Sequence, residues 1–196
     1  MSEAVAAIDA AKAGDLPRLR ELLAADASLA NARDAEQGWP ILLWAAMYGF
    51  SGRTTSLKPV VDLLLTAGAE ADIFAAAYLN RPEDARSLLH EDASRAQAAD
   101  EQGWTPLHHA AERGAAEVAR LLLDAGANPN ARNAAGQAPI HCAAHAGPWK
   151  PHPAADVIAL LKERGAEIDA HLAAALGDAA QLQALIAADA AISACS

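Results

Sequence analysis

The sequence predicts a mainly α fold, a solenoid of about six stacked helix pairs that forms a single elongated domain. Alanine, the best helix former, makes up more than a quarter of the 196 residues, whereas aromatic residues make up only 4%. A glycine or asparagine also recurs every 30 to 35 residues, where a short helix should end. Repetition at this period is typical of stacked repeats, in which each unit buries its apolar faces against its neighbours. The recurring positions are Gly14, Gly49, Asn80, Gly114, Gly147 and Gly177.

The most regular copy, residues 102–133, shows why each element should form where it does. Pro106 stands where the first turn of a helix tolerates a missing N–H, and the Ala-Ala pair that follows allows close packing. Gly114 can adopt the left-handed conformation that ends this helix. Val118 and Leu122 have helical spacing, so they predict the apolar face of a second helix. The same order, each time beginning with a short turn, is found in residues 37–72 and 136–169.

The first helix of this copy begins with a specific motif. Thr105-Pro106-Leu107-His108-x-Ala110 matches the T-P-L-H-x-A signature of the ankyrin repeat residue for residue. Residues 138–143 are a close variant and residues 39–46 a degenerate one, so the chain resembles ankyrin repeat proteins along essentially its whole length. The resemblance implies a β-hairpin finger before about three of the helix pairs, and a concave binding groove lined by fingers and first helices. It also implies that His108 and His141 hydrogen-bond to the backbone between neighbouring repeats.

The copies divide the chain into six expected repeats, three of which lack the Thr-Pro-Leu-His start. The first, third and sixth are expected to be helix pairs with little or no hairpin, and the first and last to act as caps. The third interrupts the row of hairpins, so we expect it to be the weakest point of the stack. Insertions near 50–58 and 147–153 lengthen the turn between the two helices of the second and fifth repeats. The repeats run roughly over residues 1–33, 34–72, 73–99, 100–132, 133–169 and 170–196.

Composition narrows the classes of partner and compartment. The net charge of -10 and pI of about 5.0 disfavour nucleic acid and anionic membranes, which such a chain would repel. The two cysteines, Cys142 and Cys195, form no disulfide framework, which favours a reducing, cytoplasmic compartment. The N-terminal stretch carries acidic residues rather than a basic segment, and no apolar window free of charges is long enough for a membrane span.

Groove positions that packing does not dictate are expected to face outward and to contact a partner. Aromatic side chains gather at these positions, and interface hot spots favour Trp, Tyr and Arg. For Trp39 and Trp104 the alternative is packing between hairpins. The predicted partner-binding residues are Trp39, Trp44, Met47, Tyr48, Tyr78, Trp104, His109, Glu112, Arg113, His145 and Trp149.

Four of the outward positions could also hold a metal ion. His109 and Glu112 share one helix face, as do Cys142 and His145 on the next helix, and all four side chains are competent zinc ligands. The alternative is a polar surface that binds no metal, because the spacing matches no familiar metal motif. Cys142 and His145 could in principle form a nucleophile pair, but no orienting third group is evident.

The sequence therefore predicts a non-enzymatic scaffold for protein–protein interaction that binds a partner protein or peptide through its concave face. It is expected to be a monomer without a cofactor. Acidic turn tips at Asp34, Glu36, Asp100 and Glu101 either are plain solvated charges or form a rim that steers a basic partner. The alternative function is a small-molecule or metal pocket, with or without enzymatic activity, walled by the two insertions. Its expected lining is Trp44, Tyr48, Tyr78, Trp104 and His109.

Overall fold

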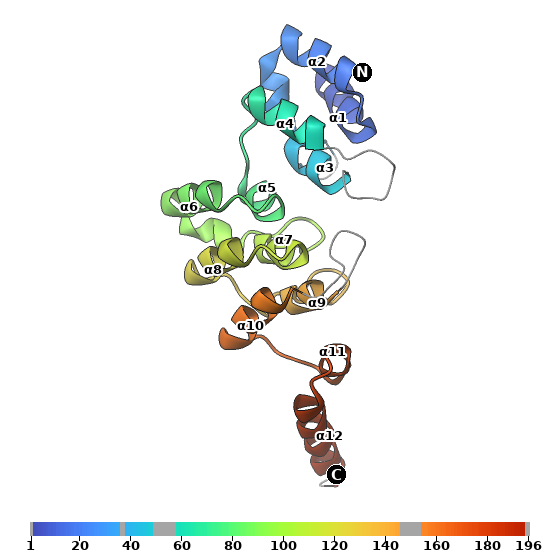
Figure 1. The fold of residues 1–196 in the computed structure, drawn as a ribbon, viewed down its shortest axis with the longest axis vertical. Coiled ribbons are helices and arrows are strands. Elements are labelled where there is room, and N and C mark those ends of the chain that lie inside the picture. Colours follow the sequence, from blue (N-terminus) through green and yellow to red (C-terminus); the bar gives the residue numbers. More distant parts are fainter. Residues whose placement is uncertain (1, 36–37, 49–57, 146–153, 195–196) are drawn as a thin grey trace.

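The computed structural model describes residues 2–35, 38–48, 58–145 and 154–194 (Figure 1). These residues form twelve α-helices in six successive pairs, and they contain no named strand, so the predicted helical solenoid is confirmed. The 3₁₀ helices η1 (Ala27–Asn31) and η2 (Ala93–Gln97) follow the first and third pairs. The pairs are α1 (Glu3–Ala13) with α2 (Leu16–Ala25), α3 (Ile41–Tyr48) with α4 (Lys58–Thr66), α5 (Ile73–Tyr78) with α6 (Pro82–Glu91), α7 (Pro106–Arg113) with α8 (Ala116–Asp124), α9 (Pro139–Ala144) with α10 (Ala155–Glu163), and α11 (Ala170–Ala175) with α12 (Ala179–Ala194).

Local chemistry explains where the helices begin and end. Asp72 caps α5 by accepting a hydrogen bond from the backbone N–H of Ala75, and Asp169 caps α11 in the same way. Gly114 ends α7 with a φ of 70°, a left-handed conformation that costs glycine little. Asn80 has a φ of 53° after α5, so the predicted equivalence of this asparagine with the glycines is confirmed. Gly49 and Gly147 lie outside the described residues.

The first helix of each pair packs on the first helix of the next, and this row forms the inner side of the stack. Figure 1 shows α5, α7 and α9 one above the other, with α6, α8 and α10 beside them as the outer row. Buried alanines such as Ala110 and Ala111 hold the inner helices close together, while leucines such as Leu122 fill the space between inner and outer helices. The inner row therefore positions the side chains of the predicted groove.

The hydrophobic core divides into two parts that meet at the short helix α5. Ala75 and Tyr78 pack with the core of the first two repeats, whereas Ile73, Ala76 and Ala77 pack with the core of the later repeats. The inner helices α3 and α5 are in contact across this junction. The third repeat, which the sequence predicts to be the weakest, is thus the place where the two cores join.

The three predicted β-hairpin fingers are turns rather than strand pairs. We call residues 33–40, 100–104 and 133–137 the first, second and third fingers. In each finger an aspartate or asparagine donates its backbone N–H to the carbonyl near the end of the turn, and the only bridge among the described residues pairs Arg33 with Pro40. The first finger has one further backbone bond, from the Ile41 N–H to the Ala32 carbonyl at 2.8 Å. One or two such bonds are too short a ladder for a strand, so the hairpin part of the fold prediction is not confirmed. The closing bonds join Asp34 to Trp39, Asp100 to Trp104 and Asn133 to Gln137, at 3.0 Å each.

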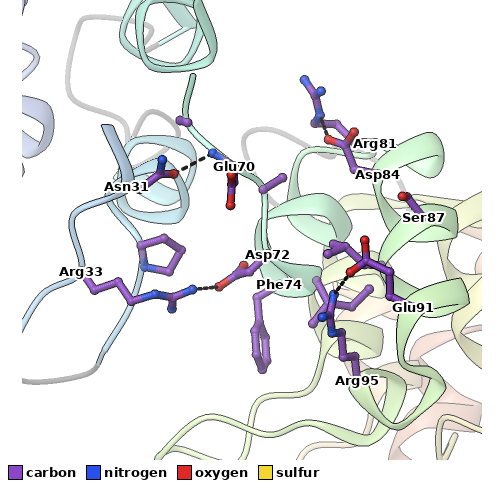
Figure 2. Close-up of a pocket in the computed structure, with 15 residues that line it drawn as sticks. Asn31, Arg33, Glu70, Asp72, Phe74, Arg81, Asp84, Ser87, Glu91 and Arg95 are labelled. Carbon is purple, nitrogen blue, oxygen red and sulfur yellow. Dashed lines mark hydrogen bonds and ion pairs between the residues drawn. The ribbon is translucent and has the colours of Figure 1, made fainter. Parts of the chain in front are cut away.

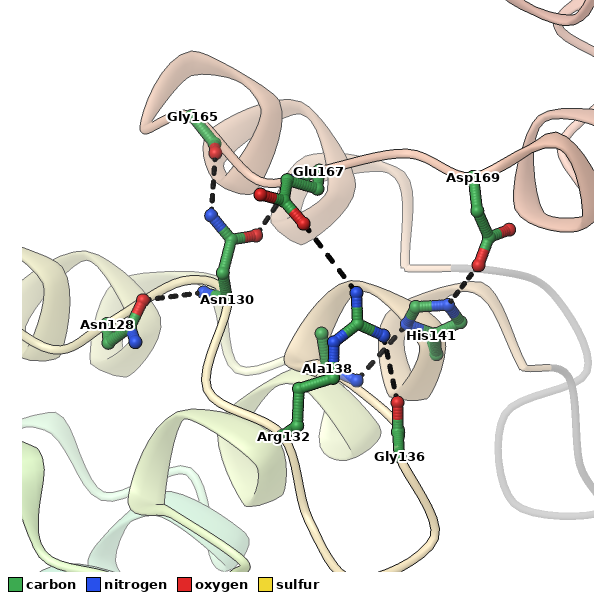
Figure 3. Close-up of polar contacts among 9 residues, drawn as sticks. All are labelled: Asn128, Asn130, Arg132, Gly136, Ala138, His141, Gly165, Glu167 and Asp169. Atoms are coloured by element: carbon green, nitrogen blue, oxygen red, sulfur yellow. Dashed lines mark hydrogen bonds and ion pairs between the residues drawn. The ribbon is translucent and has the colours of Figure 1, made fainter. Parts of the chain in front are cut away.

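Two fingers are followed by a repeat that has no finger, and both junctions are built alike. At the third finger, the Asn130 amide donates to the Gly165 carbonyl at 3.0 Å and accepts from the Glu167 N–H at 2.8 Å (Figure 3). These bonds tie the loop after α8 to the loop after α10. Asn31 makes the same two contacts at the first finger, with Gly68 and Glu70.

An arginine completes each of these two fingers. The Arg132 guanidinium donates to the Gly136 carbonyl of its own finger at 2.9 Å and lies 3.7 Å from the Glu167 carboxylate of the next repeat (Figure 3). It thus covers the edge of the third finger, where a following finger would lie. In the first finger, Arg33 donates to the Gly38 carbonyl in the same way, but its ion pair is with Asp72 of the next repeat, two residues after Glu70.

The second finger differs because another finger follows it. Its residue equivalent to Arg33 and Arg132 is Ala99, and its edge is covered by the third finger. The Ala134 N–H donates to the Gln102 carbonyl at 2.8 Å, and a Cβ at Gly103 would lie only 3.1 Å from the Cα of Asn133. The residue just before the first aspartate or asparagine of a finger, at positions 33, 99 and 132, therefore differs with the kind of repeat that follows: arginine before a repeat without a finger and alanine before a repeat with one.

Candidate partner-binding face

An aromatic layer lies between the inner helices of the third and fourth repeats. The His109 ring stacks on Trp104 at a centroid distance of 5.2 Å and meets Tyr78 edge-on at 5.6 Å. Phe74 closes a further side, with ring centroids 6.1 Å apart. Phe74 and Tyr78 of α5 and Trp104 of the second finger thus surround the His109 ring, and the layer fills space that alanine-built helices would leave empty.

His109 is fully buried, which corrects the expectation that it faces outward. Both of its ring nitrogens are buried without a hydrogen-bond partner. Burial, assisted by the nearby His108, lowers the pKa of His109 to about 3, so its ring is neutral near pH 7. A side chain enclosed in this way cannot touch a partner directly, and its role in the structure is to support Trp104.

Trp44 and Tyr78 are also buried, at 6% and 4% exposed, so the expectation that they project from the groove is wrong for them too. Burial raises the pKa of Tyr78 to about 12, with a further contribution from the negative charge of Glu112 that Arg113 partly offsets. The guanidinium of Arg113 lies over the Tyr78 ring, 4.9 Å from its centroid. Tyr78 therefore provides the ring on which the Arg113 guanidinium of the fourth repeat rests.

A second aromatic group joins the first and second repeats. The Trp39 and Trp44 rings are tilted against each other with centroids 4.9 Å apart, and the Trp44 indole N–H donates to the Asp34 carboxylate at 2.9 Å. The Lys12 ammonium, from the end of α1, lies 3.8 Å from the centroid of the Trp44 ring. Lys12 is not among the predicted contacts, although it follows the Ala-Ala pair of its repeat as Met47 and Glu112 follow theirs.

The accessible part of the predicted face is smaller than the sequence suggests. Trp39, Met47, Trp104, Glu112 and Arg113 are half-buried, and His145 is exposed at the end of α9. The side chain of Tyr48, the whole of Trp149 and nearly all of both insertions lie outside the described residues.

The four candidate metal ligands do not form a site in the part of the chain that the structure describes. No group of three His, Cys, Asp or Glu side chains there could hold a metal ion. His109 is enclosed by aromatic rings, Cys142 is 7% exposed, and His145 stands in the open after α9. The burial of Cys142 also places it poorly for the nucleophile pair with His145.

The acidic turn tips have a structural role at two positions. The Asp100 carboxylate accepts from the backbone N–H groups of Gln102 and Trp104, at 2.9 and 2.8 Å. Asp34 accepts from Trp39 and Trp44. Neither aspartate is the plain solvated charge or the free rim charge that the sequence analysis considered. Glu101 is exposed, and Glu36 lies outside the described residues.

The signature histidines behave as the family resemblance implies at one position and differently at the other. His108 accepts from the Thr105 N–H through Nδ1, so its Nε2 carries the proton and contacts the Gln137 carbonyl of the next finger at 2.9 Å. Burial lowers the pKa of His108. No finger follows His141, and its Nε2 lies 3.2 Å from the Asp169 carboxylate instead of a backbone carbonyl (Figure 3).

A cleft of about 860 Å³ opens between the second and third repeats, beside the first finger (Figure 2). Its lining includes three arginines and four carboxylates, so it offers no positive excess that would select an anion. Of the residues predicted to line a ligand pocket, the four whose side chains the structure describes, Trp44, Tyr78, Trp104 and His109, are not among those that line this cleft. The ion pairs in the cleft are Arg33–Asp72 at 3.3 Å, Arg95–Glu91 at 3.2 Å and Arg81–Asp84.

Comparison with known proteins decides the family. The family model "Ankyrin repeats (3 copies)" matches residues 73–171, which is half of the chain. The chain belongs to the ankyrin repeat family. Ankyrin repeats are generally protein–protein interaction modules and are typically non-enzymatic. In the part of the chain that the structure describes, no helix combines the length and apolar character needed to cross a bilayer.

Individual relatives resemble part of this chain and are much longer proteins. The chain is 36% identical over 87 residues to neurogenic locus notch homolog protein 4 of Homo sapiens, covering 44% of this chain and 4% of that protein. It is 31% identical over 119 residues to transient receptor potential cation channel subfamily A member 1 of Homo sapiens, covering 58% and 10%. It is 31% identical over 156 residues to the mitochondrial disaggregase of Bos taurus, covering 71% and 21%. The chain thus spans about a fifth or less of the length of these relatives.

Proposed function

We propose that this ankyrin repeat protein is a non-enzymatic scaffold that binds a partner protein or peptide on its inner face, between the first and second fingers. The observation that carries the proposal is the pair of half-buried tryptophans, Trp39 and Trp104, each resting on a buried aromatic ring. Met47, Glu112 and Arg113 lie nearby on α3 and α7, the inner helices that carry the buried rings of Trp44 and His109. Tryptophan, methionine and arginine are enriched at protein interfaces, and tryptophan and arginine are frequent hot spots.

The buried layer gives the two tryptophans the rigidity that an interface anchor needs. Trp104 is fixed by its stack on His109, and Trp39 by its contact with Trp44. A side chain already held in one conformation loses little entropy when a partner covers it. The overall charge of -10 favours a basic partner and disfavours nucleic acid. We also propose that the chain acts as a monomer in the cytoplasm.

Site-specific photo-crosslinking in cells of the source organism tests this proposal. A photoreactive amino acid replaces Met47 or Arg113 on the inner face, or the exposed Glu117 or Arg120 on the outer helix α8 as matched controls. We expect one protein adduct of the same mass from both inner positions and none from the outer ones. Trp104→Ala, introduced beside the Met47 probe, should reduce the adduct at least fivefold while circular dichroism stays unchanged. Equal crosslinking from both faces would refute the proposal.

A further inference from the structure

Lys12 contacts an aromatic ring, although the chain is acidic and offers many carboxylates. Its ammonium lies over the face of Trp44, 3.8 Å from the ring centroid. Asp9 stands three residues earlier on α1, the spacing at which a carboxylate can pair with a lysine, yet the two form no ion pair. In the structure the Lys12 ammonium thus lies against the Trp44 ring although a carboxylate is about one turn away on the same helix.

The surroundings of Trp44 explain this attraction. Tryptophan has the strongest cation-binding face of the aromatic side chains. Its indole N–H donates to the Asp34 carboxylate at 2.9 Å, which adds electron density to the ring and places a negative charge beside it. The Trp39 ring, tilted by 47° with its centroid 4.9 Å away, provides a second aromatic surface next to the first. The group is thus a two-ring site with a carboxylate on one ring edge.

We infer that Trp39 and Trp44 form a binding site for the ammonium group of a partner's lysine side chain, and that Lys12 occupies this site in the free protein. Lys12 is held there by a flexible four-carbon stem and is itself only half-buried, so it can leave without unfolding α1. The inference rests on the proposed function for the identity of the partner. The site itself is independent of that partner, since any alkylammonium ion supplies the same chemistry.

Occupation by Lys12 makes the site self-masked. An ammonium group from a partner must displace the ammonium group of Lys12. Its apparent affinity equals its affinity for the open site multiplied by the fraction of molecules in which Lys12 has left the site. From the usual strength of a cation–aromatic contact, removal of Lys12 is expected to raise the affinity for an external ammonium about 5- to 30-fold.

Titration with n-butylammonium chloride, with neutral n-butanol as the shape-matched control, tests the inference. The readout is the ¹H–¹⁵N NMR signal of the Trp44 indole N–H. We expect Lys12→Gln to bind butylammonium at least fivefold more tightly than the wild type, butanol to leave the signal unmoved, and a further Trp39→Leu substitution to abolish the gain. Equal affinities of the wild type and Lys12→Gln, or equal responses to butanol and butylammonium, would overturn it.

A second measurement does not depend on a variant. The ε-methylene protons of Lys12 should be shifted upfield by the Trp44 ring in the wild type, and saturating butylammonium should return them toward the free-lysine position. Protons that stay shifted while butylammonium binds would show that Lys12 does not mask the site, and the inference would fail. Butylammonium binding without inner-face crosslinks would refute the proposed function alone. Crosslinks without butylammonium binding would refute the ammonium site alone.

Discussion

Lowering the pH should destabilise this protein through His109. The pKa of His109 is about 3 in the folded chain and about 6.5 when exposed, because burial disfavours the charged imidazolium. The unfolded chain therefore binds a proton that the folded chain rejects. The stabilisation is complete above pH 6.5 and is lost progressively as the pH falls from 6.5 toward 3.

The size of this effect follows from the two pKa values. At pH 5 the folded state still excludes the proton, so the loss is determined by the unfolded-state pKa and amounts to about 2 kcal/mol. Near pH 3 it approaches about 4 to 5 kcal/mol. A loss of about 2 kcal/mol is a large part of the total stability of a domain of this size.

Urea unfolding at pH 7.5 and pH 5.0, followed by circular dichroism, measures the loss directly. His109→Leu keeps an apolar side chain of similar size within the aromatic layer and removes the titration. Its free energy of unfolding should fall by about 2 kcal/mol less than that of the wild type between the two pH values. His90→Gln, at an exposed position of α6, is the matched control and should behave like the wild type. An equal pH dependence in His109→Leu and the wild type would refute the assignment to His109.

Three further predictions concern the stack itself. Gly103→Ala should lower the free energy of unfolding more than Gly38→Ala does, because both glycines have positive φ but only the new Cβ at 103 meets the next finger. The left-handed backbone alone accounts for a loss of about 1 kcal/mol at either position. Equal losses in urea unfolding would contradict the packing argument. Asn130→Ala should lower the free energy of unfolding by about 1 to 2 kcal/mol in the same assay, because it removes two hydrogen bonds that join successive loops. No change in the free energy of unfolding would show that bonds to water replace these two bonds. Amide hydrogen exchange, read by mass spectrometry, should be fastest among the internal repeats in residues 73–99, where the two cores meet; faster exchange in another internal repeat would contradict this.

The helical scaffold could be predicted from short-range signals in the sequence. Pro106 and Gly114 specify the start and end of α7 through their own backbone preferences, and Asn80 replaces glycine because asparagine also tolerates positive φ. The fingers were harder to predict. Asp34 and Asp100 close each turn with side-chain bonds to the backbone, so the turns form without the strand ladders that the family resemblance implies.

For the candidate site, the sequence indicates which side of an inner helix a residue occupies, but not how deeply that residue is buried. Helical register gives the side of a helix that His109 occupies, but its burial depends on the neighbouring helix α5, whose Phe74 and Tyr78 lie against the ring. The two large residues four positions apart on α5 were the available signal. The Asn-Ala-Arg tripeptide, present at residues 31–33 and 130–132, was a second one, since it marks the two junctions that share their contacts.

The residue at positions 33, 99 and 132 limits how this array could change length. Arginine stands where the next repeat has no finger, and alanine where it has one. Duplicating the second or fifth repeat, or deleting the third, would leave an arginine facing an incoming finger, and deleting the fifth would leave an alanine beside an uncovered edge. At these places a change in the number of repeats is therefore coupled to substitution at one position in the preceding repeat, and the six repeats are not interchangeable.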